Sequence, residues 1–286
     1  MSAIFGPAGS SEAFSKIYKS STDMPKYLNE MGLDAFEYQC GQGVRVSDSL
    51  GAALKARSEE FSVTLSLHAP YFISLSSVEP EKRDKSIDYI LQSAAAAKKM
   101  GAQRIVIHSG SCSKISREEA LGLAKDTLSR ARKAAVEAGF EDIIFCPETM
   151  GKFNQLGNLE EVLELCRLDD SFLPCIDFGH LNARTLGLVN SIESFERILD
   201  EIENKLGTDR LKRFHSHFSK IEYTQGGGEK RHLTFEDEMY GPRYEPLMEL
   251  IAKKNLSPTF ICESAGTQDV DALAMKKYYF EELNRI

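Results

Sequence analysis

The feature that most constrains the fold of this chain is a repeated alternation between short apolar runs and longer segments with helical spacing. Eight apolar runs have the length and composition of buried strands, at residues 3–5, 35–38, 63–67, 104–107, 143–146, 175–177, 214–218 and 260–262. Helix-like segments follow almost every run, at residues 12–31, 47–60, 81–100, 117–138, 159–168, 191–206, 244–254 and 269–283. This order predicts an α/β fold, a parallel sheet closed into a (β/α)8 TIM barrel, with a doubly wound open sheet as the alternative.

The length and the absence of a linker favour a single domain. The chain has 286 residues, a length that α/β barrels reach as one domain. No Pro/Ser-rich linker and no break in composition divides it, so we expect one domain over residues 1–286. Local signals agree with the expected helix ends. Ser116 and Glu119 have the spacing of a capping box, and Gly101 follows two lysines as a helix C-cap would.

Charge and cysteine content narrow the function classes. The 35 basic and 43 acidic residues give a net charge of −8, which argues against nucleic-acid binding by bulk positive charge. It leaves room for a local basic patch or for bound cations. No apolar run approaches the ~20 residues of a membrane span, and no secretory signal is visible. Six scattered cysteines without a CxxC pair argue against a disulfide framework, so we expect a reduced, cytoplasmic protein.

Histidines and carboxylates mark the carboxyl ends of six consecutive predicted strands, the third to the eighth. At or just beyond these ends lie His68, His108, Glu148, Asp177, His180, His215, His217, His232 and Glu263. In a barrel these ends surround one mouth, where active sites are built. Carboxylates buried together are unfavourable unless they share protons or bind cations. Imidazole and carboxylate ligands without a convergent thiolate suit Zn²⁺ or Mn²⁺.

Each of these residues also has a structural interpretation. A single histidine at a strand end is more often a hydrogen-bonded structural group. Glu148 or Asp177 alone could cap the helix that follows. The shared placement of every histidine in the chain favours a metal site over these separate explanations. His217 is the weakest candidate, because it shares strand parity with His215 and fits a supporting role.

Seven segments resemble motifs of the endonuclease IV family of apurinic/apyrimidinic endonucleases, within the xylose-isomerase-like TIM barrels. They are SLHAPYF at 66–72, VIHSGS at 106–111, CPETMG at 146–151, CIDFGHLNA at 175–183, FHSHFSK at 214–220, KRH at 230–232 and CES at 262–264. The resemblance spans residues 60 to 265. It implies a zinc-dependent hydrolase of DNA repair that cleaves DNA 5′ to abasic sites and flips the abasic nucleotide out of the helix.

The resemblance also implies residue roles. It implies two or three Zn²⁺ ions, with Mn²⁺ as an alternative, and Glu148 and Glu263 as catalytic carboxylates. The ligands of the three ions, in order, would be His68, His108 and Glu148; Glu148, Asp177, His215 and Glu263; and His180 with His232. Tyr71 and Phe72 match the position where the family inserts side chains into DNA, with pocket or core packing as the equal alternative. Lys220 and Arg231 are candidates for phosphate contact.

One position departs from the family pattern. The third ion of the family has an Asp-x-His pair, and here Lys230 stands at the acidic position before His232. Glu229 is adjacent to Lys230, but in a regular strand its side chain would point to the opposite face. A cation at this point opposes metal binding, so we expect a third site that is weak, absent or rebuilt using Glu229. The neighbouring segment Gly226–Gly228 has the composition of a mobile loop.

Three functions compete. The first is the metal-dependent phosphodiesterase, with abasic DNA as its partner, which the three histidines His68, His108 and His180 favour because one ion cannot use them all. The second is a sugar isomerase or epimerase with one Mn²⁺ or similar ion, which the acidic charge and Lys230 favour. Its ligands would be Glu148, Asp177, His215 and Glu263. The third is a catalytically silent barrel that binds DNA or a partner. The phosphodiesterase is the preferred interpretation.

Overall fold

A computed structural model of the chain describes residues 2–286. Eight parallel strands form its centre: β1 (Ile4–Pro7), β2 (Ala35–Gln39), β3 (Thr64–His68), β4 (Arg104–Ile107), β5 (Ile144–Pro147), β6 (Cys175–Asp177), β7 (His215–Phe218) and β10 (Thr259–Cys262). They pair in the orders β1-β10-β7-β6 and β2-β3-β4-β5. Parallel bridges from Ala8 to Glu37 and from Glu148 to Cys175 join the two runs. The sheet therefore closes, as predicted, into a barrel.

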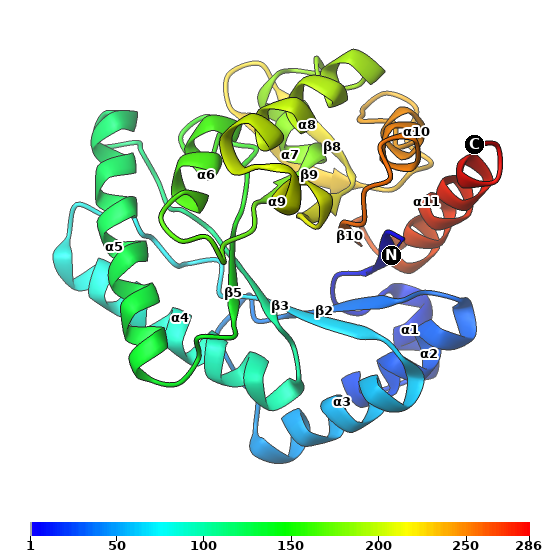
Figure 1. Ribbon diagram of the computed structural model, residues 1–286, viewed down its shortest axis with the longest axis horizontal. Coiled ribbons are helices and arrows are strands. Elements are labelled where there is room, and N and C mark those ends of the chain that lie inside the picture. The colour runs from blue at the N-terminus through cyan, green and yellow to red at the C-terminus, as the bar shows by residue number, and fades with distance from the viewer. Residues whose placement is uncertain (1) are drawn as a thin grey trace.

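The helices form a ring around the strands (Figure 1). Along the chain they are α1 (Glu12–Ile17), α2 (Met24–Met31), α3 (Asp48–Phe61), α4 (Pro80–Met100), α5 (Arg117–Glu137), α6 (Leu159–Cys166), α7 (Phe178–Arg184), α8 (Ile192–Leu206), α9 (Thr208–Lys212), α10 (Glu245–Lys253) and α11 (Gln268–Leu283). The last helix, α11, packs against the first strand, β1, so the two ends of the chain lie together.

Most predicted elements are present, but one predicted helix is divided and two short helices had not been predicted. The predicted helix 12–31 is divided into α1, a short 3₁₀ turn (Ser21–Asp23) and α2. Ser20 caps that turn by accepting from the backbone N–H of Thr22, and Pro25 lies in the first turn of α2, where proline is tolerated. The helices α7 and α9 were not expected. Asp177 starts α7, because its side chain accepts the backbone N–H of His180 at 2.7 Å.

The glycine segment is the turn of a hairpin between β8 (Lys220–Thr224) and β9 (Gly228–Leu233). Its backbone bonds to the loop after β5: the N–H of Phe153 donates to Gly227 at 3.2 Å, and that of Glu229 donates to Gly151 at 3.2 Å. The expectation of a mobile loop is therefore replaced by a hairpin docked beside the barrel mouth. This docking brings β9 next to the strand ends.

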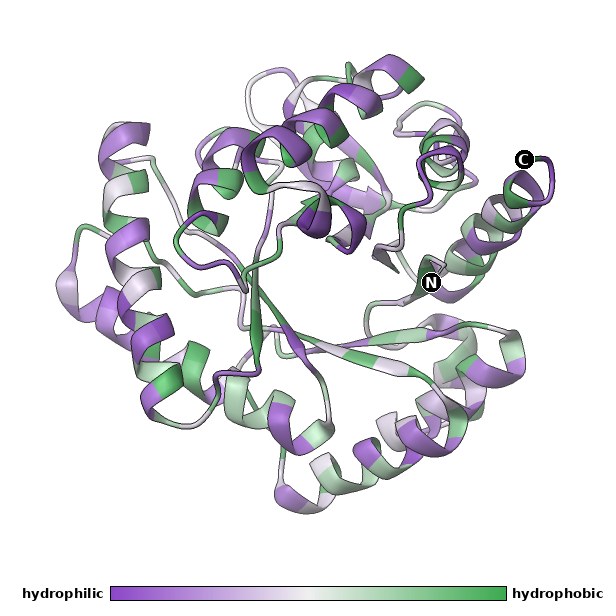
Figure 2. Ribbon diagram, in the orientation of Figure 1, coloured by the Kyte–Doolittle hydropathy of each residue, from purple (hydrophilic) through white to green (hydrophobic). Residues whose placement is uncertain are grey.

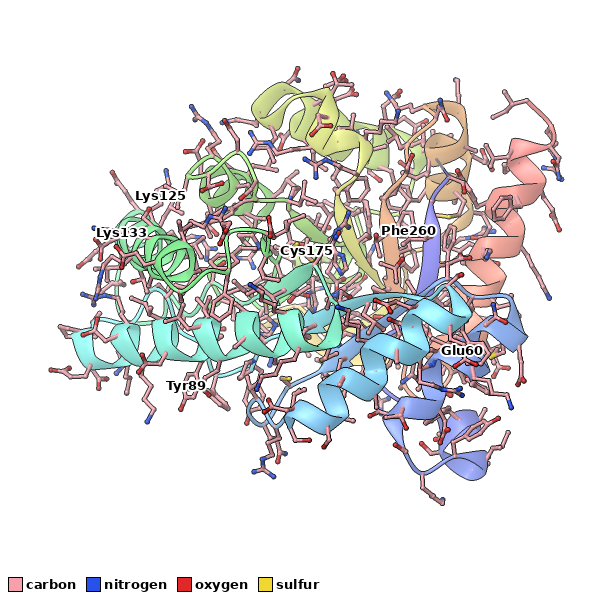
Figure 3. The ribbon with its side chains drawn as sticks, turned by 60° about the horizontal axis from the view of Figure 1, so that its bottom comes forward. Glu60, Tyr89, Lys125, Lys133, Cys175 and Phe260 are labelled. Atoms are coloured by element: carbon pink, nitrogen blue, oxygen red, sulfur yellow. The ribbon has the colours of Figure 1, made fainter. Side chains whose placement is uncertain are left out.

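The strands divide their side chains between two environments. Phe36, Ile105 and Phe145 are fully or almost fully buried and join the apolar layer under the helices. Burial of each such side chain contributes roughly 1.5–3 kcal/mol. The banded colouring of the helices in Figure 2 reflects one face turned to this layer and one to solvent. Figure 3 places Cys175 and Phe260 among the strands and Lys125 and Lys133 on the periphery.

Within residues 2–286, no helix has both the length and the apolar character that a membrane crossing requires.

Candidate metal centre

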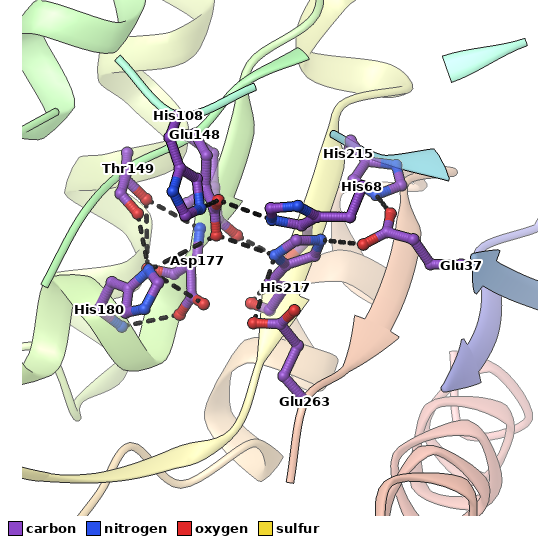
Figure 4. A network of polar contacts seen from close by, with 12 residues as sticks. Glu37, His68, His108, Glu148, Thr149, Asp177, His180, His215, His217 and Glu263 are labelled. Atoms are coloured by element: carbon purple, nitrogen blue, oxygen red, sulfur yellow. Dashed lines mark hydrogen bonds and ion pairs between the residues drawn. The ribbon is translucent and has the colours of Figure 1, made fainter. Parts of the chain in front are cut away.

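Glu148 lies at the centre of a group of histidines at the barrel mouth (Figure 4). It follows β5 directly and its side chain is 1% exposed. Its Oε2 lies 2.9 Å from Nε2 of His108 and 3.4 Å from Nε2 of His68. Its Oε1 lies 2.9 Å from Nδ1 of His217 and 3.6 Å from Nδ1 of His180. Four strand ends or the turns after them therefore deliver imidazoles to one carboxylate.

Two further carboxylates lie beside this group. Asp177 Oδ2 is 3.2 Å from Nδ1 of His180, and Glu263 Oε2 is 3.6 Å from Nδ1 of His217. Asp177, Glu263, Glu148 and His217 each offer one ligand atom, and these four atoms all lie within 4.8 Å of one another. Asp177 and His217 lie on β6 and β7, and Glu148 and Glu263 directly follow β5 and β10; β10, β7 and β6 are neighbours in one run of strands, and the bridge from Glu148 to Cys175 brings β5 beside them.

A bulge in β9 brings Glu229 to the same mouth. Glu222 on β8 pairs with Arg231, and the next β8 residue, Tyr223, pairs with Glu229, so Lys230 is an extra residue in β9. Lys230 Nζ and Arg231 Nε lie 2.5 and 2.6 Å from the two carboxylate oxygens of Glu222, on the side away from the mouth. The bulge thereby returns Glu229 to the side of the hairpin that faces the barrel.

Glu229, His180 and His232 form a third group of ligand-type side chains. Nε2 of His180 lies 3.4 Å from Oε2 of Glu229, and the three residues offer atoms within 4.8 Å of one another. Ser219 Oγ lies 2.8 Å from Nδ1 of His232 and fixes that ring. Glu229, and not Lys230, is thus the residue of this segment that lies with His180 and His232.

The structure separates the two histidines of β7. His217, near the carboxyl end of β7, reaches Glu148, whereas His215 is the first residue of the strand and lies deeper in the barrel. Nε2 of His215 is 2.9 Å from Oε2 of Glu37, and its Nδ1 is 3.4 Å from Nη1 of Arg104. His215 therefore does not approach Glu148, and it is His217 that joins Glu148, Asp177 and Glu263; His215 instead lies in a separate group of ligand-type side chains with Cys175 and His217.

The four residues expected to contact DNA have different surroundings. Tyr71 is 61% exposed and lines the cavity at the mouth. Phe72 is 41% exposed and packs edge-on against Tyr89. Lys220 donates to the backbone carbonyls of Phe235, at 2.8 Å, and Asp237. Arg231 is paired with Glu222, as described above. Tyr71 is therefore the member of this set that faces the metal centre.

The electrostatics of the mouth favour positive charge. Burial alone would raise the pKa of Glu148, but the charges of His217 and His108 hold it well below its usual range. Burial alone would lower the pKa of His68, but the adjacent Glu148 raises it to about 9. The pKa of His180 is also raised to about 9, against burial, chiefly by the charge of Asp177. Burial raises the pKa of Asp177 itself. A divalent cation would experience the same stabilising field as these protons.

The donor atoms fit a divalent cation. Oε2 of Glu148 and Oδ2 of Asp177 are buried and have no hydrogen-bond partner among residues 2–286. The 2.9 Å contact from His108 to Glu148 lacks hydrogen-bond geometry. A buried acceptor without a partner costs about 1–3 kcal/mol, which a bound cation offsets. Imidazole nitrogen and carboxylate oxygen together suit Zn²⁺ or Mn²⁺.

A cavity of about 380 Å³ opens above these groups. Its wall includes the loop after β5, and two arginines hold that loop. Arg184 donates to the carbonyls of Met150 and Lys152, both at 2.8 Å, and Arg117 donates to that of Phe153 at 3.0 Å. Among the described residues that line the cavity, Lys152 is the only lysine or arginine. The loop thus presents one cation beside an otherwise acidic and imidazole-rich centre.

Two residues of this region, Glu37 and Lys152, were not found by sequence reasoning, and Glu229 was named there only as a residue that could rebuild the third site. Glu37, Lys152 and Glu229 lack a motif of their own. Glu37 offered a usable signal, because a carboxylate in the middle of the apolar run 35–38 faces the barrel interior or the helices, and both are buried. Lys152 and Glu229 lie on a loop and a bulged strand, whose side-chain directions have no sequence period.

Comparison with known proteins places the chain in a family. The sequence profile of the xylose isomerase-like TIM barrel matches residues 25–283. The chain belongs to this family. An uncharacterized protein of Methanocaldococcus jannaschii is 34% identical over 278 residues, which cover 97% of each chain. A "probable endonuclease 4" of Mycoplasma pneumoniae is 29% identical over 195 residues, which cover 66% of this chain and 64% of the relative.

Solved structures share the barrel fold of this chain. A D-tagatose 3-epimerase-like protein superposes with a TM-score of 0.74 at 20% identity, over 99% of this chain and 98% of that one. Endonuclease IV from Thermus thermophilus gives a TM-score of 0.69 at 18% identity, over 98% and 99%. These likenesses confirm the barrel. The relatives at the level of sequence confirm the resemblance to endonuclease IV, over less than two thirds of the Mycoplasma pneumoniae relative's length.

Proposed function

We propose that this xylose isomerase-like barrel is a metal-dependent phosphodiesterase that cleaves DNA 5′ to abasic sites. The observation that carries the proposal is the presence of three neighbouring groups of ligand-type side chains at one mouth, two of which share Glu148. In the proposal they are His68 and His108 with Glu148; Asp177, His217 and Glu263 with Glu148; and His180, Glu229 and His232. One ion cannot contact all of these residues, whereas two or three Zn²⁺ ions, with Mn²⁺ as an alternative, can.

Bound divalent ions at this mouth would activate a water and neutralise charge on the phosphate and the leaving oxygen. The protein residues bind, orient and hold protons around that chemistry. Glu263 lines the cavity and is 16% exposed, so its carboxylate is placed to take a proton from a water in the cavity. Lys152 supplies a positive charge from the cavity wall and is placed to contact the phosphate. Tyr71, exposed at the rim, has a ring that can fill the gap left by a missing base.

A duplex with a single abasic site tests the proposal. The zinc-loaded wild-type protein is expected to nick this duplex on the 5′ side of the site and to leave an otherwise identical intact duplex uncut. Glu263→Gln keeps the size of the side chain and removes its charge. We expect it to be at least about 100-fold slower, the usual effect of losing a positioned acid or base. Equal nicking by the wild-type protein and by Glu263→Gln contradicts the proposal.

A sugar isomerase or epimerase is the second candidate. It is favoured by the four-residue group Glu148, Asp177, His217 and Glu263, which can hold one ion and surround it with carboxylates suited to proton transfer. Lys230 no longer supports it, because this residue pairs with Glu222 away from the mouth. Metal content separates the candidates: two or three equivalents per chain support the phosphodiesterase, and one equivalent with ketose epimerisation supports the sugar enzyme. Full metal content with neither activity indicates a silent barrel.

A further inference from the structure

A carboxylate lies inside the barrel, one layer below the mouth. Glu37 on β2 is fully buried and pairs in register with Ser66 on β3. Its Oε2 accepts a hydrogen bond from Ser66 Oγ at 2.8 Å and lies 2.9 Å from Nε2 of His215. Its Oε1 lies 2.8 Å from Nε2 of His217, off the line of a straight hydrogen bond. Figure 4 shows His217 between Glu37 on one side and Glu148 on the other.

Stability alone does not account for a charged residue at this position. The interior of a TIM-type barrel layer is ordinarily filled by branched apolar side chains, as it is in part here by Val106 and Ile261. A buried ion pair is often no more stabilising than apolar residues of the same volume, because both charges must be desolvated. The arrangement around Glu37 instead fixes one of its oxygens on Ser66 and His215. The other oxygen is thereby held beside the ring of His217.

The ring of His217 faces two carboxylates with one nitrogen and one carboxylate with the other. Nδ1 lies 2.9 Å from Glu148 and 3.6 Å from Glu263, and Nε2 lies beside Glu37. A neutral imidazole has one N–H and one lone pair. With an ion bound beside Glu148 and Glu263, a proton on Nδ1 would be repelled, so the ring would keep its proton on Nε2 beside Glu37 and its lone pair on Nδ1. That lone pair points into the group of carboxylates where a cation is expected.

We propose that Glu37 is a positioning residue that orients His217 and strengthens its bond to the ion shared with Glu148, Asp177 and Glu263. The inference rests on the metal centre of the proposed function and is independent of the substrate. Outer partners of this kind fix the tautomer and raise the basicity of a ligating histidine, and their loss costs about 10–100-fold in metal affinity. Glu37 thus binds no ion itself and acts through His217.

Metal affinity of the full chain tests this role without an activity assay. Zn²⁺ affinity is measured by competition with a chromophoric chelator for the wild-type protein, Glu37→Gln and Glu37→Asp. Glu37→Gln keeps the shape and loses the charge, and it is expected to weaken the ion at His217 by about 10–100-fold. Glu37→Asp keeps the charge at a greater distance from His217 and should recover part of that loss. Co²⁺-loaded protein should show a changed visible spectrum in Glu37→Gln, because the orientation of one ligand is altered.

A matched control separates this role from a general effect of losing a buried carboxylate. Asp269 is 1% exposed, binds Ser11 and Tyr27, and belongs neither to the cavity wall nor to any group of ligand-type side chains, so Asp269→Asn should leave Zn²⁺ affinity unchanged. If Glu37→Gln does not fold, Ser66→Ala decides, since it frees one oxygen of Glu37 and should weaken Zn²⁺ binding by a smaller factor. If Glu37→Gln binds Zn²⁺ with wild-type affinity, the role of Glu37 is overturned and the proposed function stands. The same holds for Ser66→Ala if Glu37→Gln does not fold. A wild-type chain that binds no Zn²⁺ overturns the proposed function and, with it, the premise of this role.

Discussion

Lys230 lies with its Nζ 2.5 Å from Oε1 of Glu222, on the outer side of the β8–β9 hairpin. This pair takes the lysine away from the mouth and gives its place to Glu229. If Glu229 holds the third ion, Glu229→Gln should lower the zinc content by about one equivalent per chain, whereas Lys230→Ala should leave it unchanged. Deletion of Lys230 removes the bulge but leaves Glu229 opposite Tyr223, on the face of His232, so the zinc content should stay at the wild-type level. Metal analysis after gel filtration measures all three. Zinc loss in Lys230→Ala alone would contradict this prediction.

His217 and His215 form a matched pair of substitutions on one strand. His217→Ala should weaken the ion shared with Glu148 by more than about 100-fold, since even an outer partner is worth about 10–100-fold. His215→Ala should cost about 1–3 kcal/mol of unfolding free energy, because Glu37 loses a buried partner. Its effect on zinc affinity should be at most about tenfold, through the weakened support of Glu37. Chelator competition and urea unfolding of both variants check the prediction, and the reverse order of zinc affinities would refute it.

Lys152 should control the binding of an anionic substrate. Lys152→Ala is expected to raise KM for abasic DNA while zinc content stays at the wild-type level, because the ammonium lies on the cavity wall and not among the ligands. The dependence of log KM on log salt should fall by about 0.9, the contribution of one phosphate contact. Lys133→Ala, on the outer face of α5, is the control and should change neither quantity. An unchanged salt slope in Lys152→Ala would remove this residue from the proposal.

Glu164 should contribute to stability in a pH-dependent way. Hydrogen bonds from Lys125 and Arg167 lower the pKa of Glu164 to about 2 in the folded chain. A folded-state pKa below the unfolded value means that this stabilisation is present at pH 7 and is lost as the pH falls from about 4.5 to 2. Its size is about 1 kcal/mol or less, as for other ion pairs near the surface. Urea unfolding of the wild-type protein and Glu164→Gln should differ at pH 7 and converge near pH 2. A constant difference across this range would contradict the assignment.

The sequence predicts the barrel well because strand and helix signals repeat eight times. The strands at 104–107 and 175–177 have the predicted bounds, and α5 ends within one residue of its predicted end. The break between α1 and α2 was missed although Ser20 and Pro25 are local signals, since the apolar spacing continues through them. The short helix α7 was missed although Asp177 had been named as a possible cap of a following helix.

The site was less predictable than the fold, for reasons of register. His215 and His217 point to the same face of β7, so strand parity cannot tell which one lies at the mouth. That choice depends on how far β7 is shifted along its neighbours β6 and β10, which is a property of the closed sheet. Glu229 was out of step in sequence and is brought into place by a bulge. Glu37 was treated as part of an apolar run, and its partners Ser66 and His215 are far from it in sequence.

The pairing of β1 with β10 has a consequence for the growing polypeptide. Glu263 follows the last of the barrel strands, and that strand must dock on the first before the ring is complete. A ribosome-bound chain that has reached the end of β9 already carries the other carboxylates and all six imidazoles, but it has neither the final acid nor the closed wall behind it. The cluster can therefore be completed only after the last strand has been synthesised and has docked, and products truncated before it lack Glu263.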